Sequence, residues 1–253
     1  FRGIGLSSAV KKIIMEQIKS RLAGLRLPGM AHCWQTLYET RKVNELSLSD
    51  GLELLLQSEE DQRTSNRCAR LLKNAAFRYK ASIEELSNDP ARGIDKSLIT
   101  RLSLGEYIKN GDSILISGAA GVGKSFLASA LGHQACLQGY SVAYYNMQKL
   151  MIKLKQNRLE GIIIRQFEKL AATDLLIIDD FGLTTLERQQ QLDLMEIIED
   201  RHNRKATIIA SQFPVASWFD IIGEETIADA ILDRIVHTSH RFELKGESLR
   251  KKL

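Results

Sequence analysis

Residues 118–125 read Gly118-Ala119-Ala120-Gly121-Val122-Gly123-Lys124-Ser125, which fits the pattern G-x-x-x-x-G-K-[ST] of phosphate-binding loops. An apolar run at 113–117 precedes this loop, and a helix-forming run at 126–135 follows it. A short apolar run in this place is typical of a buried parallel strand. The order strand, loop, helix is the context in which the pattern binds phosphate. We therefore predict a nucleotide site at this junction.

The chemistry of the loop favours a nucleoside triphosphate with Mg²⁺. Glycines let successive backbone N–H groups turn toward an anion, and the following helix adds the positive end of its dipole. In such loops the lysine, here Lys124, reaches the β- and γ-phosphates, and the hydroxyl, here that of Ser125, binds Mg²⁺. The expected cofactors are ATP and Mg²⁺. The expected nucleotide-binding residues are Gly118, Ala119, Ala120, Gly121, Val122, Gly123, Lys124, Ser125 and Phe126.

A second apolar run ends in two carboxylates, Asp179 and Asp180. In nucleotidases Asp179 would hold the Mg²⁺ hydration shell with Ser125, and Asp180 would orient the attacking water. The simpler alternative is a buried strand that ends in a turn. The next apolar run ends in Ser211 and Gln212. A polar side chain there would lie between the carboxylates and the γ-phosphate, and Gln212 is the first candidate, ahead of Ser211.

Composition places the chain among ordinary globular proteins. It has 253 residues, 44% of them hydrophobic and 26% charged, and a net charge of +4. No apolar run reaches the ~18 residues of a membrane span, and the start at Phe1 lacks a secretory pattern. The three cysteines have no metal-ligand spacing and are expected to be free thiols. We expect a cytoplasmic protein with no membrane partner, in which the first 14 or so residues are upstream sequence and Met15 is a candidate start.

A strongly basic segment runs from residue 63 to residue 80 and contains no acidic residue. Helical spacing would gather its basic residues on one face and Cys68, Leu71, Leu72 and Ala75 on the other. The face could simply be solvated, but uncompensated charge favours contact with a nucleic-acid backbone. The candidate DNA-binding residues are Arg63, Arg67, Arg70, Lys73, Arg78 and Lys80.

The order of elements predicts the fold class. Strands that alternate with helices after residue 110 indicate an α/β domain with a five-stranded parallel sheet covered on both faces. The chain before it shows only helical periodicity, which predicts a small all-α N-terminal domain. We place the boundary near residue 90, giving a helical DNA-binding or partner domain at 1–90 and an ATPase domain at 91–253.

Several motifs together resemble the IstB transposition helper ATPases of bacterial insertion sequences, which are AAA+ proteins related to the DnaC helicase loader. The resemblance covers roughly residues 25–253. Besides the phosphate loop, it rests on these motifs: Leu176-Ile177-Ile178-Asp179-Asp180-Phe181-Gly182, Ser211-Gln212-Phe213-Pro214, Ala230-Ile231-Leu232-Asp233-Arg234, and Glu243-Leu244-Lys245-Gly246-Glu247-Ser248-Leu249-Arg250.

The resemblance implies an ATP-dependent DNA-binding protein. Such a protein would form a homo-oligomer on duplex DNA, with ATP at the subunit interfaces, and would deliver the target to a transposase of the IstA kind. Arg234 matches the arginine finger, which would act on a neighbour's γ-phosphate; a surface ion pair with Asp233 or another acid is the simpler alternative. AAA+ proteins usually carry Glu where this chain has Asp180, so hydrolysis is expected to be slower or to depend on assembly. The helical lid is expected to be nearly absent.

The sequence leaves two other functions open. One is a helicase loader that binds single strands, although the basic segment lacks the interleaved aromatic residues that stack on unpaired bases. The other is a free-standing metabolic NTPase or kinase, which would work as a monomer without DNA. The basic segment and the candidate finger Arg234 favour an ATPase that assembles on DNA over both of these alternatives.

Overall fold

The computed structural model describes residues 8–86, 92–237 and 239–249. Its contacts divide the chain into two compact units, Phe1–Ala69 and Arg70–Leu253. This division comes earlier than the boundary expected near residue 90. The reason is that Ala75, Ala81 and Leu86 pack into the hydrophobic core beneath the sheet, which assigns the segment that contains them to the second unit.

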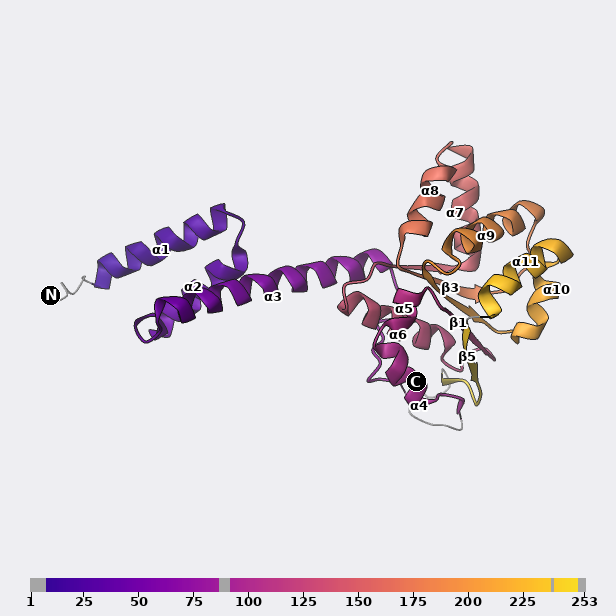
Figure 1. The fold of residues 1–253 in the computed structure, drawn as a ribbon, viewed down its shortest axis with the longest axis horizontal. Coiled ribbons are helices and arrows are strands. Elements are labelled where there is room, and N and C mark those ends of the chain that lie inside the picture. Colours follow the sequence, from indigo (N-terminus) through magenta and orange to yellow (C-terminus); the bar gives the residue numbers. More distant parts are fainter. Residues whose placement is uncertain (1–7, 87–91, 238, 250–253) are drawn as a thin grey trace. The chain divides into compact units, whose positions relative to one another are not determined.

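The N-terminal unit is helical, as expected (Figure 1). It contains α1 (Ser8–Gly24), α2 (Pro28–Glu39), the short η1 (Lys42–Asn44) and most of α3 (Leu48–Ala75). Pro28 begins α2, a position where its missing N–H costs nothing. The next two N–H groups, of Gly29 and Met30, donate to Glu59 Oε2 on α3 at 2.8 and 3.3 Å. Glu59 is buried and is also paired with Arg63 at 2.7 Å.

The basic segment departs from its prediction at its C-terminal end. Helix α3 ends at Ala75, and Ala76 adopts a left-handed backbone with a φ of 55°. Arg78 and Lys80 therefore do not lie on the helix, and the prediction of one cationic helical face over all six residues is wrong for these two. Phe77 is the cause we identify, because its ring packs against Gly132 and Tyr144, which belong to the second unit as Phe77 does.

The second unit contains the predicted five-stranded parallel sheet, with the order β2-β3-β4-β1-β5. The strands are β1 (Ser113–Gly118), β2 (Val142–Asn146), β3 (Leu175–Phe181), β4 (Ala206–Ser211) and β5 (Ser239–Leu244). Strand β4 lies between β1 and β3, with Ile209 opposite both Leu115 and Ile178. The parallel arrangement therefore brings the C-terminal ends of β1, β3 and β4 together at one edge, where the predicted site residues lie.

Helices cover both faces of the sheet (Figure 1). One hydrophobic cluster joins the sheet to α4 (Lys96–Ser103), α5 (Glu106–Asn110) and α6 (Lys124–Leu137). The other joins it to α7 (Met147–Leu159), α8 (Ile163–Ala172), α9 (Arg188–Arg201), α10 (Trp218–Ile222) and α11 (Glu225–Val236). The short α10 was not predicted; it forms because Trp218 is fully buried, with its ring 4.7 Å from that of Phe181. In the part of the chain that the structure describes, no helix has the length and apolarity to span a membrane.

Glu59 makes the N-terminal unit sensitive to acid. Hydrogen bonds from Arg63 and from the N–H groups of Met30 and Gly29 outweigh burial and hold the pKa of Glu59 below its ordinary value. A lowered folded-state pKa adds stability that is present above the unfolded value of about 4.3 and is lost as pH falls through the folded value. We expect Glu59→Gln to weaken the N-terminal unit at pH 7, and the difference from wild type to shrink as pH falls.

Tryptophan fluorescence can measure this effect on the N-terminal unit alone. The chain has two tryptophans, and in a Trp218→Phe background only Trp34, which bonds the Met15 carbonyl at 3.3 Å, reports urea unfolding. Glu60→Gln, at an exposed position on the same helix, is the matched control. A loss of stability for Glu59→Gln that stays constant from pH 7 to pH 3 would contradict the role given to this carboxylate.

Candidate ATPase site

The phosphate loop connects β1 to α6, as predicted. Gly118, Gly121 and Gly123 have φ values of 146°, 83° and 108°, which side chains with a Cβ rarely adopt. These conformations explain the glycines of the motif and turn the loop tightly into the helix. Lys124 is buried, and its Nζ donates to the carbonyl of Ala119 at 2.8 Å. The lysine is thus folded back onto its own loop. To bind phosphate, its ammonium group would have to give up the Ala119 carbonyl for a phosphate oxygen.

Asp179 is the centre of the site. Its side chain is fully buried at the end of β3, and Oδ1 accepts from Ser125 Oγ at 3.0 Å and from the Asp180 N–H at 2.9 Å. The Tyr144 hydroxyl donates to Oδ2. Burial, and then the hydrogen bond to Asp179, raise the pKa of Tyr144, so this hydroxyl remains a donor. The start of α6, strand β2 and strand β3 itself therefore all supply donors to the same carboxylate.

The residues around Asp179 fit Mg²⁺. The predicted pair, Ser125 and Asp179, is brought together as expected, and both offer the hard oxygen ligands that this ion prefers. Mg²⁺ typically uses one or two protein oxygens together with phosphate and water. Among the described residues no cluster of three acidic, histidine or cysteine side chains is found. Bound there, the ion would supply positive charge to the phosphates.

Asp180 is held by two residues that the sequence reasoning did not place in the site. Its backbone is left-handed, with a φ of 57°, and its Oδ2 accepts from Asn146 Nδ2 at 2.9 Å and from Arg78 Nη1 at 3.1 Å. The same Arg78 nitrogen lies 3.7 Å from Asp179 Oδ2. Asn146 and Tyr144 could have been suspected, because they end a strand beside β3. Arg78 had been assigned to DNA, and its local sequence carries no signal of this contact.

At the C-terminal end of β4, the two polar candidates, Ser211 and Gln212, have different surroundings. Ser211 is fully buried; its Oγ donates to the Phe181 carbonyl at 2.8 Å and accepts from the Phe213 N–H at 3.1 Å. This hydroxyl therefore holds the turn after β4. Gln212 is half-buried, and among the described residues no hydrogen bond of its side chain is found. Its amide is the one free to reach a ligand at this edge of the sheet.

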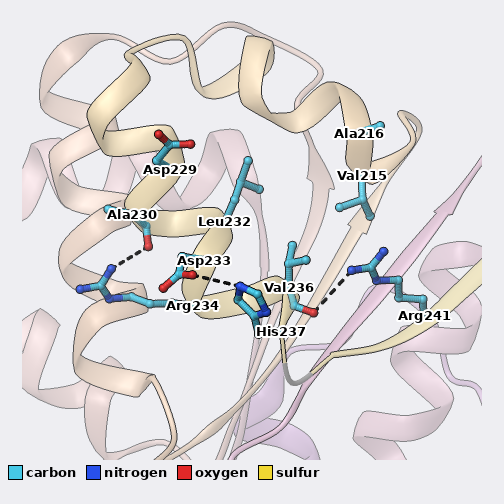
Figure 2. A pocket seen from close by; sticks show the side chains of 10 residues that line it. All are labelled: Val215, Ala216, Asp229, Ala230, Leu232, Asp233, Arg234, Val236, His237 and Arg241. Carbon is cyan, nitrogen blue, oxygen red and sulfur yellow. Dashed lines mark hydrogen bonds and ion pairs between the residues drawn. The ribbon is translucent and has the colours of Figure 1, made fainter.

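Arg234 lies on α11, beside a surface hollow of about 760 Å³ that Figure 2 shows from close by. Its Nε is 2.5 Å from Glu199 Oε2, and its Nη1 donates to the Ala230 carbonyl at 2.8 Å. His237 pairs with Asp233 at 3.0 Å along the same hollow. In the single chain Arg234 thus forms an ion pair, with Glu199 and not with Asp233.

The segment after β5 folds over the phosphate loop. Leu249 donates its N–H to the Gly121 carbonyl at 3.0 Å, and a Cβ at Gly121 would come within 2.1 Å of Ser248 Oγ. Arg92 reaches the Glu247 carbonyl at 3.1 Å. The motif of residues 243–249 therefore forms part of the wall of the nucleotide site. Arg250, which ends that motif, lies outside the described residues.

The candidate DNA-binding residues fall into separate groups. Arg63 is paired with Glu59, and Arg78 with Asp180 and Asp179. The other four lie exposed: Arg67, Arg70 and Lys73 on α3, and Lys80 beyond its end. Contact between these residues and DNA remains a prediction.

Residues 20–253 match the family described as IstB-like ATP binding protein. The chain belongs to this family. It is 42% identical over 231 residues to the putative insertion sequence ATP-binding protein y4pL of Sinorhizobium fredii, which covers 91% of this chain and 94% of that protein. The resemblance inferred from the motifs is confirmed.

Solved structures confirm the fold. The chain matches the crystal structure of DnaI with a TM-score of 0.56 at 18% identity, covering 71% of this chain and 92% of that one. It matches the DnaC helicase loader with a TM-score of 0.50 at 21% identity, covering 62% and 95%. At these identities the likeness shows the fold alone. This IstB-like protein has a P-loop AAA+ core. It is an ATPase and is related to the ATP-binding proteins of insertion sequences.

Asn146 has two functions that can be separated by substitution. Its Nδ2 holds Asp180, while its Oδ1 caps α7 by accepting from the N–H groups of Gln148 and Lys149 at 3.1 and 3.4 Å. Asn146→Asp keeps a good cap but replaces the donor with a like charge; Asn146→Ala loses both. We expect both variants to lower ATP turnover about tenfold, part of the 10²–10⁴ that a positioned base contributes. Asn146→Ala should also lose about 1 kcal/mol of stability, because it removes the cap of α7.

Steady-state ATP hydrolysis and thermal unfolding measure the two effects. Asn157→Ala, at a buried position on α7 away from the cap, controls for general damage to this helix. Full turnover by Asn146→Asp would show that the bond to Asp180 has no part in hydrolysis.

Proposed function

We propose that this chain is a transposition helper: an ATP-dependent DNA-binding protein that assembles on duplex DNA and recruits a transposase. The observation that carries the proposal is the match, over nearly the full length of both chains, to a protein named as an insertion sequence ATP-binding protein. The nucleotide site described above supplies a switch for assembly. A helper of this kind works inside the cell on chromosomal DNA, so a cytoplasmic location follows from the function.

The residues of the site divide the chemistry among them. Lys124 and the loop N–H groups would bind the phosphates, and Ser125 and Asp179 would hold Mg²⁺. Asp180 would orient the attacking water, with Asn146 fixing its carboxylate. Gln212 would complete the site from the tip of β4.

Arg234 would act on the ATP of a neighbouring copy. A trans arginine stabilises charge in the transition state and is worth about 10³–10⁵ in rate. Support comes from its place beside an exposed hollow rather than in the chain's own nucleotide site. Its pair with Glu199 leaves the side chain 26% exposed, so a γ-phosphate of the neighbour could compete for it. ATP would then lie at the interface between subunits of a homo-oligomer.

A helicase loader is the second candidate, and the observation that favours it is the fold shared with DnaC and DnaI. Fold likeness at this level does not carry function. The DNA substrate distinguishes the two, because a transposition helper acts on duplex targets and a loader on single strands. A gel shift with the two forms of the same sequence, in ATP and Mg²⁺, decides between them.

Lys124→Ala tests the nucleotide switch. Loss of this ammonium group removes the main contact to the β- and γ-phosphates, so we expect ATP-dependent complexes on duplex DNA to disappear. Sedimentation with and without DNA at low ionic strength measures the assembly. Lys169→Ala, at an exposed position on α8, is the matched control. Complexes that form with Lys124→Ala as readily as with wild type would exclude ATP as the assembly signal.

A triple substitution on α3 tests the DNA surface. Each lysine or arginine that contacts a phosphate adds about 0.9 to the slope of log K against log salt. We expect Arg67→Ala, Arg70→Ala and Lys73→Ala together to weaken duplex binding equally on all sequences and to reduce the slope by about 3. Fluorescence anisotropy across a salt series measures this. Arg165→Ala with Lys169→Ala, both exposed on α8, is the control, and an unchanged slope for the triple variant would place the DNA elsewhere.

A further inference from the structure

Arg78 is fixed beside the catalytic carboxylates by the aromatic residues on either side of it. Phe77 packs edge-on against Tyr144, with ring centres 6.2 Å apart, and a Cβ at Gly132 would come within 2.6 Å of its ring. Tyr79 packs against Phe126, the first residue after the phosphate-loop motif, at 6.5 Å. Tyr144, which donates to Asp179, and Phe126, which follows the phosphate loop, both adjoin the nucleotide site. The position of Arg78 is therefore set by contacts with the site and not by α3.

One guanidinium group spans the two acids on which hydrolysis depends. Arg78 Nη1 lies 3.1 Å from Asp180 Oδ2 and 3.7 Å from Asp179 Oδ2. A carboxylate oxygen that already accepts from a cation is less available as a hydrogen-bond acceptor for water. The same positive charge repels a second cation that approaches Asp179. In this arrangement Arg78 occupies the carboxylate oxygens that water and Mg²⁺ would otherwise contact.

The contact is of a kind that another anion can displace. The Arg78 side chain is 43% exposed and that of Asp180 20% exposed, so solvent screens the pair and it is weak. Arg78 also lies within the basic segment, two residues from the exposed Lys80 and five from the exposed Lys73. A nucleic-acid backbone offers a dense row of phosphates to such a group.

We propose that Arg78 is a regulatory cation that links DNA to hydrolysis: it engages Asp180 and Asp179 in the DNA-free chain, and DNA phosphates draw it away. Asp180 is then released to orient water, and Asp179 is released to bind Mg²⁺. This inference rests on the proposed function, because it takes duplex DNA as the anion. It changes the role predicted for Arg78 from a plain DNA contact to a positioning residue of the ATPase site.

Arg78→Gln tests the inference by turnover. Glutamine keeps much of the length and polarity but removes the charge. We expect DNA-free ATP hydrolysis to rise about fivefold, the rate equivalent of a weak ion pair of about 1 kcal/mol. Stimulation by duplex DNA should fall by the same factor. Arg78→Lys should keep both the low basal rate and the stimulation.

A binding measurement provides a readout that does not depend on turnover. Fluorescent ATP is titrated at increasing Mg²⁺ without DNA, and the Mg²⁺ concentration at half-maximal binding is read. We expect Arg78→Gln to lower this concentration severalfold, because Asp179 no longer has a competing cation 3.7 Å away. Lys169→Gln is the matched control, since it removes the same charge from an exposed position on α8, outside the basic segment, and should leave both readouts at wild-type values.

The outcomes separate this inference from the proposed function. A wild-type protein whose ATPase ignores DNA contradicts the proposed function, and the Mg²⁺ titration still reports on the contact itself. If wild type responds to DNA and Arg78→Gln responds equally, with unchanged Mg²⁺ dependence, the inference is overturned. It is also overturned if Arg78→Gln binds ATP normally and hydrolyses none, because Arg78 would then take part in the reaction itself.

Discussion

The hydrogen bond from Ser125 to Asp179 is the interaction on which the rest of the site depends. It connects the phosphate loop after β1 to the end of β3, across the tip of β4. A buried carboxylate is tolerated only where donors surround it, and Asp179 receives them from Ser125, Tyr144 and its own neighbour. These donors also define where a cation and a triphosphate can bind, so the same bonds that satisfy the core prepare the chemistry.

In the single chain, each cation to which we give a role in the proposed mechanism or its regulation already has a partner. Lys124 donates to the Ala119 carbonyl, Arg78 spans the two acids of β3, and Arg234 is paired with Glu199. A phosphate must displace each of these partners before the cation can serve it. This arrangement suits a protein whose hydrolysis waits for assembly. Under the proposed function, each exchange is a separate point at which nucleotide, DNA or a neighbouring copy would act.

Much of the fold could be predicted because its signals are local. Apolar runs marked β1, β3 and β4, and the glycines of the phosphate loop marked the turn that positions Lys124. The places where prediction failed have non-local causes. Helix α3 stops at Ala75 because the ring of Phe77 packs against Gly132 on α6, which is distant in sequence. The short α10 exists because Trp218 fills the core. Neither partner can be read from the neighbouring sequence.

The sequence by itself determined the nucleotide chemistry of this protein and its family, since a phosphate loop needs particular residues at fixed spacing. It also determined the parallel sheet, through the alternation of apolar runs and helices. Only the tertiary structure decided which charges meet. Arg78 is about a hundred residues from Asp180 in sequence, and parallel packing places the ends of separate strands at one edge. Charge pairing acts through space over a few ångströms, and the order of residues along a chain does not encode that distance.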